Sequence, residues 1–183
     1  MATIAGYRLF ANDTTARHGV GDTMVGAAYT VVQRTNMQLG LHVMAMIPTG
    51  DRLLGMGHFM GMPSVFASYH AHPVVVVGSV GPSFALGGDG DHASHSGPIV
   101  APMNQYELTW DAGLDLMVDA AGQRMIGARL SGGAPIGDGT NRVFGGLRAQ
   151  LGGDTMSYVL EVQAGLDGDP FTVRGIVKGV VAL

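Results

Sequence analysis

The sequence predicts an all-β protein, an antiparallel up-and-down transmembrane β-barrel of about ten strands that forms a single domain over residues 1–183. Three observations predict this fold. Polar and apolar residues alternate along unusually long runs, charged residues are scarce while glycine is abundant, and short links between the runs alternate with long ones.

The run "NQYELTWDAGLDLMV", residues 104–118, shows the alternation most clearly. Apolar residues recur at every second position from Tyr106 to Val118, and Glu107, Asp111 and Asp115 lie between them. Side chains two residues apart share one face of a β-strand. The run is longer than the usual strand of a soluble domain and exceeds the roughly 9–11 residues that span a bilayer. It therefore predicts a strand with lipid on one face and an acidic interior on the other.

The composition fits a protein with little surface in contact with water. The chain is 46% hydrophobic and only 13% charged, about half the usual charged share of roughly 25%. Its 30 glycines, against 8 prolines, predict many turns and closely packed strands. There is no cysteine, so disulfides and thiolate metal sites are excluded. The formal net charge of −4 provides no basic field, and we expect no nucleic-acid partner.

The connections alternate in length. Tight links are expected near residues 33–36, 72–73, 119–122 and 152–154, whereas the other links are long and polar or glycine-rich until a moderate one at 167. Short turns at one end and long loops at the other are typical of bacterial outer-membrane barrels. The expected strands are 2–10, 22–33, 36–47, 63–72, 74–87, 104–118, 123–131, 141–151, 155–166 and 171–182.

Nearly every ionisable residue of these strands lies on the face opposite the apolar one. In a membrane barrel that face lines a wet lumen, whereas in a soluble sandwich it is the outside. Opposed acidic and basic walls can orient polar solutes or can form ion pairs that fill a narrow barrel, and ten strands slightly favour filling. The expected lumen and solute-path residues are Glu107, Asp111, Asp115, Arg129, Arg142, Arg148, Glu161, Arg174 and Lys178.

Methionine and histidine form a second pattern, with 12 methionines in the chain and alternation in "GMGHFMGMP". Thioether and imidazole ligands together favour soft ions, above all Cu(I), bound weakly along a permeation route. The alternative is that methionine fills irregular spaces and that loop histidines are solvated. The candidate copper ligands are His42, Met44, Met46, Met56, His58, Met60, Met62, His70, His72, His92 and His95.

Two stretches resemble the paired-strand signature of an outer-membrane family named for the meta-pathway of phenol degradation. In that signature a Gly-x-Gly-Asp strand precedes one that ends in Leu/Ile-Pro-Thr-Gly. "DAGLDLMVD" and "GLDGDPFTVRGIVKGVV" resemble later strands of the same family. The residues that match the signature here are Gly19, Gly21 and Asp22, followed by Ile47, Pro48, Thr49, Gly50 and Asp51.

The resemblance implies a channel or transporter in the bacterial outer membrane, with membrane lipid and a small solute or metal ion as partners. Family members are usually longer, begin with a signal peptide and carry further N-terminal strands, so we expect an N-terminally truncated chain. The motif residues also have a simpler interpretation, because glycine, proline and aspartate at these positions are typical of turns and strand ends.

Two other classes remain open. One is a soluble or secreted β-sandwich or small barrel that binds a ligand or a metal, and the other is a purely structural membrane barrel with a filled lumen. We do not expect an enzyme, because the sequence contains no Gly-x-Ser-x-Gly, His-Glu-x-x-His or nucleotide-binding loop.

Overall fold

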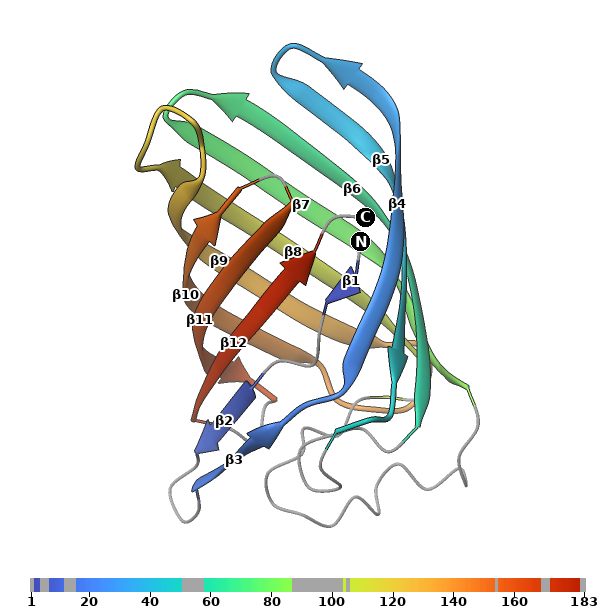
Figure 1. Ribbon diagram of the computed structural model, residues 1–183. Coiled ribbons are helices and arrows are strands. Elements are labelled where there is room, and N and C mark those ends of the chain that lie inside the picture. Colours follow the sequence, from blue (N-terminus) through green and yellow to red (C-terminus); the bar gives the residue numbers. More distant parts are fainter. Residues whose placement is uncertain are drawn as a thin grey trace.

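The computed structural model describes residues 2–3, 7–11, 16–50, 58–86, 104, 106–153, 155–168 and 172–181. These residues form one antiparallel sheet that curls into a barrel-like shape (Figure 1). The strands are β1 (Ala2–Thr3), β2 (Tyr7–Ala11), β3 (Ala16–Val20), β4 (Thr23–Arg34), β5 (Met37–Ile47), β6 (Phe59–Ala71), β7 (Val74–Leu86), β8 (Tyr106–Met117), β9 (Arg124–Pro135), β10 (Arg142–Gly152), β11 (Met156–Asp167) and β12 (Val173–Val181).

From β4 to β12, each strand pairs with the next one in the chain. The short strand β1 pairs with both β4 and β12, and β12 also pairs with β2, so the order of neighbours runs round in a circle. The prediction of an all-β, antiparallel, up-and-down sheet is therefore confirmed.

The strand count differs from the prediction, because the sheet contains twelve strands rather than about ten. The segment expected as one strand at 2–10 contains β1 and most of β2, β4 replaces the strand expected at 22–33, and β3 lies in the stretch between them that was predicted to be a loop. The pairs Ala2–Val25 and Tyr7–Val20 follow the same register, so β1 and β2 lie in line opposite β4 and β3. Gly21 and Asp22 separate β3 from β4. They lie beside the residues that follow β5.

The predicted separation of short and long connections is confirmed for the connections that the structure describes. The β4–β5, β6–β7, β8–β9 and β10–β11 links are short, and Figure 1 shows them together at one end. The β5–β6, β7–β8 and β9–β10 links leave from the opposite end. We call these the short-turn end and the long-loop end.

Two strands extend into segments that were expected to be loops. β6 begins at Phe59 instead of residue 63, and β9 continues to Pro135 instead of stopping at 131. Glycine in both extensions suggested loops, but each extension gives room to a large neighbour. A Cβ on Gly132 would lie 2.7 Å from the Trp110 ring. The lack of a side chain at Gly132 therefore makes room for the tryptophan ring.

Two prolines lie together in the middle of the sheet. The β6–β7 pairing runs from Phe59–Leu86 to Gly61–Phe84 and resumes at Val65–Val80, with Pro63 and Pro82 in the gap. Proline has no N–H to donate to the backbone hydrogen bonds between strands. Because the two prolines lie opposite each other, the missing donors fall in a single gap between β6 and β7. The Thr109 hydroxyl donates to the Gly81 carbonyl at 3.0 Å and so satisfies a backbone acceptor beside this gap.

The two faces of the sheet have opposite chemistry. Large apolar side chains are exposed on the outside, among them Leu41, Leu114 and Leu160 at 51%, 46% and 52%. The inside buries ionisable side chains instead. Among strand residues whose side chains are described, Arg34, Arg124 and Asp167 are the Asp, Glu, Lys or Arg residues that the register places on the outside, and each is the first or last residue of its strand. No helix in the described ranges is long and apolar enough to cross a membrane.

Candidate functional site: the charged interior

The inner wall carries a buried ion pair between β8 and β9. Arg129 Nη2 donates to Asp115 Oδ2 at 2.5 Å, and the two side chains are 5% and 4% exposed. They are diagonal neighbours, because Arg129 lies opposite Gly113 and Asp115 lies opposite Gly127. A Cβ on either glycine would collide with the facing charged side chain. Glycine at both positions therefore allows the pair to lie flat against the wall.

A second ion pair joins β8 to β10 across β9. Arg142 Nη2 donates to both carboxylate oxygens of Glu107, at 2.8 and 2.7 Å. Gly133 on β9 lies directly opposite Arg142, and a Cβ there would be 2.8 Å from Glu107 Oε2. Asn104 Nδ2 donates to the same carboxylate oxygen at 3.2 Å and to the Thr140 carbonyl at 3.1 Å. The pair is thereby tied to the loop between β9 and β10.

An aromatic ring continues this layer toward β12. The guanidinium carbon of Arg174 lies 3.8 Å from the centre of the Phe144 ring and that of Arg142 lies 5.9 Å from it. Such contacts are attractive because the ring face is electron-rich. Arg174 Nε donates to Gln163, whose amide donates to Glu161. Lys178 Nζ lies 3.8 Å from Glu161 Oε2.

A cavity of about 760 Å³ occupies the interior near the short-turn end. The β8–β9 turn, residues 120–122, forms part of its lining, together with Gln38, Ser68, His70, Ser79, Asp111 and Arg148. Asp115 and Arg129 reach it as well. The Arg148 guanidinium donates to Gln150, while Arg148 Nε and Asp115 Oδ1 have no hydrogen-bond partner among the described residues.

All nine residues expected in the lumen lie on the inner side of the sheet, in two groups. Four of them, Asp111, Asp115, Arg129 and Arg148, line the cavity. The other five take part in ion pairs or in the contact with the Phe144 ring. They are Glu107, Arg142, Glu161, Arg174 and Lys178. Their place in a solute path stays a prediction.

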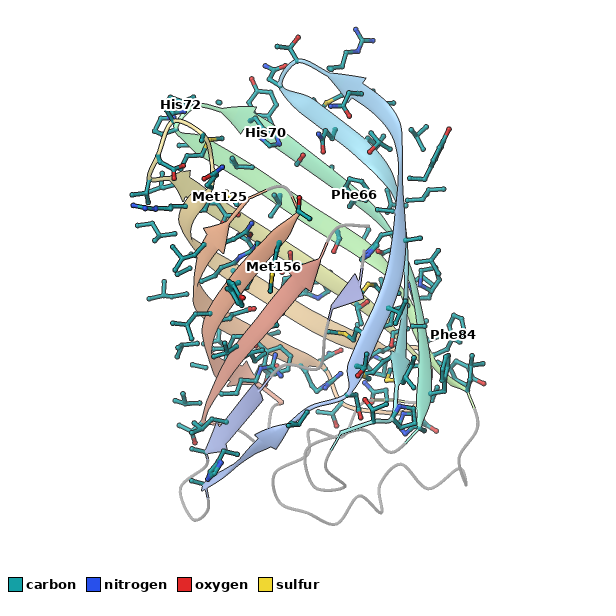
Figure 2. All side chains as sticks on the ribbon, viewed as in Figure 1. Phe66, His70, His72, Phe84, Met125 and Met156 are labelled. Carbon is teal, nitrogen blue, oxygen red and sulfur yellow. The ribbon has the colours of Figure 1, made fainter. Side chains whose placement is uncertain are left out.

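The expected copper ligands do not come together as one group. His42, Met44, Met46, Met60 and Met62 share the inner faces of β5 and β6, and His58 is buried just before β6. His70 lines the cavity and His72 lies in the exposed β6–β7 turn, both at the short-turn end (Figure 2). Met56, His92 and His95 lie outside the described residues.

The two halves of the glycine–aspartate and proline–threonine motif meet at the long-loop end. Gly50 N donates to Asp22 Oδ1 at 2.9 Å, and Thr23 N donates to Thr49 Oγ1 at 3.0 Å. Asp22 is 2% exposed. The turn chemistry expected at these residues is therefore a direct contact between the start of β4 and the end of β5. The sequence does not predict this contact, because the alternation of strand and turn residues carries no signal for it.

Comparison of the chain with models of protein families finds no match, and comparison with curated proteins finds none either. The resemblance to the family named for phenol degradation therefore stays a prediction.

Proposed function

We propose that the protein is a β-barrel of the bacterial outer membrane, whose charged lumen admits small polar solutes from the short-turn end. The proposal has two parts, insertion in the membrane and access of solutes to the interior.

The apolar outer belt supports membrane insertion. On β6, Phe59 and Tyr69 both face outward, are 37% and 48% exposed, and lie ten residues apart with no charged residue on the outer face between them. Ten residues rise about 34 Å along a strand. At the usual tilt of about 35–45° this gives roughly 24–28 Å across the bilayer, close to the apolar band of about 25 Å in such barrels.

Aromatic side chains mark both edges of this belt. Tyr106 and Phe84 are paired neighbours near the long-loop end, and Figure 2 shows Phe84 pointing away from the sheet. Tyr69 and Tyr158 lie near the short-turn end, and the Tyr69 hydroxyl accepts a hydrogen bond from Asn36 Nδ2 at 3.2 Å. Aromatic residues with a polar tip favour the boundary between lipid and water.

The interior supports solute entry from one side. The cavity near the short turns is lined by charges of both signs and by polar side chains. Toward the long-loop end, the layer of Glu107, Arg142, Phe144 and Arg174 occupies the lumen. A small polar molecule fits the cavity, and this layer would limit its further passage.

Membrane insertion is tested with the full chain refolded in detergent. We expect the folded protein to stay in solution only with detergent or lipid, and to migrate differently on a gel before and after boiling. A monodisperse, detergent-free monomer would reject insertion and would favour the soluble barrel.

Solute passage is tested by single-channel recording in planar bilayers. We expect low conductance for the unmodified protein and higher conductance for Phe144→Ala, because the ring and the two guanidinium groups that contact it fill space inside the sheet. Tyr158→Ala, on the outer face, serves as the control and should leave conductance unchanged. Equal conductance for all three proteins would favour a filled, purely structural barrel.

A further inference from the structure

We propose that the inner faces of β4, β5 and β6 hold a binding site for a soft monovalent cation, Cu(I) or Ag(I). The donors are the thioethers of a methionine cluster, supported by the imidazole of His42. The methionine cluster consists of Met24, Met44, Met46, Met60 and Met62. The site goes beyond the proposed solute cavity, from which it is separate.

The cluster is built on the register of three strands. Met46 pairs with Met24 on one side and with Met60 on the other, so three methionines form one row across the wall. Directly opposed residues have Cβ atoms about 4.5–5.5 Å apart, within reach of long thioether side chains. Met46 and Met60 are 5% and 0% exposed, and Met24 and Met62 pack against them.

The next rows bring further thioethers and one imidazole toward this group. Met44 pairs with Met62 on β6 and with Gly26 on β4, and its sulfur lies over the glycine. One row further on, His42 lies between Ala28 and Ser64. His42 Nε2 is buried and has no hydrogen-bond partner among the described residues. A buried nitrogen without a partner is costly, and a bound metal ion would supply one.

The donor chemistry selects the ion. Thioethers favour Cu(I) over hard cations, and imidazole is compatible with copper. The methionine cluster and His42 contain no carboxylate. In the part of the chain that the structure describes, no group of three or more His, Asp and Glu side chains is placed to hold a metal ion. A soft monovalent cation therefore fits these residues better than a divalent ion such as Ca²⁺ or Mg²⁺.

Packing alone would not require sulfur at these positions, since leucine fills similar volume. Leucine lacks only the sulfur donor, so it separates metal binding from packing. Replacing methionine by leucine conserves volume and usually costs less than about 1.5 kcal/mol, so the variant Met46→Leu/Met60→Leu should fold while lacking two central donors. Met117 and Met125 also face each other on the inner wall, at the short-turn end. Met117→Leu/Met125→Leu is thus a matched control.

The experiment titrates the detergent-folded full chain with Ag(I) by calorimetry, and with Cu(I) in competition with a chromogenic Cu(I) chelator. We expect the unmodified protein and the control variant to bind equally. We expect Met46→Leu/Met60→Leu to bind at least about tenfold more weakly, a loss of about 1.4 kcal/mol. X-ray absorption should show sulfur neighbours of the metal in the unmodified protein, with a light-atom neighbour that disappears in His42→Ala.

Absence of binding by the unmodified folded protein would overturn the proposal. So would equal binding by both double variants, because the ion would then be held elsewhere. Gel mobility before and after boiling establishes folding for every variant. Since that assay also reports membrane-type folding independently of the metal, failure of this proposal is distinguishable from failure of the proposed barrel function.

Discussion

Glu107 and Arg142 are bound to each other across an intervening strand. One guanidinium nitrogen of Arg142 donates to both oxygens of the Glu107 carboxylate, and the two side chains are 0% and 5% exposed. Because water does not reach this carboxylate, the guanidinium balances its charge. The side-chain amide of Asn104 donates a further hydrogen bond to it. The pair joins β8 to β10 independently of the backbone ladder.

The first prediction concerns this pair. Glu107→Gln preserves shape but leaves the Arg142 charge buried without its partner. Breaking a buried pair in this way typically costs about 3–5 kcal/mol. The free energy of unfolding can be measured by urea titration in detergent, followed through the fluorescence of Trp110, the chain's one tryptophan.

Arg124→Gln provides the comparison for that measurement. The Arg124 side chain is 70% exposed, and its Nε lies 3.9 Å from Asp119 Oδ2. Exposed pairs contribute about 0–1 kcal/mol, so this variant should unfold almost as the unmodified protein does. An equal decrease in the free energy of unfolding for the two variants would show that the buried Glu107–Arg142 pair stabilises the fold no more than an exposed pair does.

The second prediction concerns the space that Gly133 leaves for the pair. Gly133→Ala would place a Cβ 2.8 Å from Glu107 Oε2, and forcing an extra methyl group into a packed site usually costs about 1–3 kcal/mol. Gly179→Ala on β12 is the control, since a Cβ there meets nothing within 4 Å. The same urea titration should show destabilisation for Gly133→Ala alone. A loss of similar size in both variants would point to a general cost of alanine in these strands.

The third prediction places arginine on the outer face of β6. Val65 lies between the two aromatic edges and is 45% exposed, whereas Ala71 is the last residue of the strand. In a membrane barrel, arginine costs about 2–4 kcal/mol at the midplane and about 0–1 near the interface. Val65→Arg should therefore reduce the free energy of unfolding in lipid vesicles much more than Ala71→Arg. On a surface in contact with water both changes would stay within about 0.5 kcal/mol, and that result would contradict membrane insertion.

The fourth prediction concerns the contact between Asp22 and Gly50. Asp22→Ala removes the acceptor of the Gly50 N–H and should lower the free energy of unfolding by about 1–3 kcal/mol. Asp22→Asn keeps an oxygen that can accept the same bond, so its loss should be smaller. The thermal midpoint of the change in gel mobility is a suitable measurement. Identical midpoints for the two variants would assign the effect to the charge of Asp22 instead of the hydrogen bond.

Much of the fold could be predicted because a strand exposes its pattern directly. Alternation along 104–118 separated Leu114 and Leu116 from Glu107 and Asp115, and the structure places the leucines outside and the acids inside. The face assignment needs only the period of the side chains. The strand ends at Phe59 and Pro135 were missed because local glycine content suggested loops, while the reason for the glycines lies on neighbouring strands.

The pairing of charges could not be predicted to the same depth. The sequence placed Glu107 near several arginines without identifying its partner. That choice depends on register and on Gly133, which lets the Glu107 and Arg142 side chains meet over β9. The row formed by Met24, Met46 and Met60 likewise depends on how β4 and β6 align with β5. Such alignments are tertiary information, which periodicity in one strand does not contain.

The circular order of the strands also bears on how the chain reaches its folded state. Most neighbouring strands are joined by one link, so their contacts form between residues close in sequence. Ala2, by contrast, pairs with Val181, almost the full length of the chain away. Because distant contacts are costly in chain entropy and slow folding, we expect this seam to form last. Hairpins would assemble first, and the ring would close only after β12 has been synthesised and can meet β1 and β2.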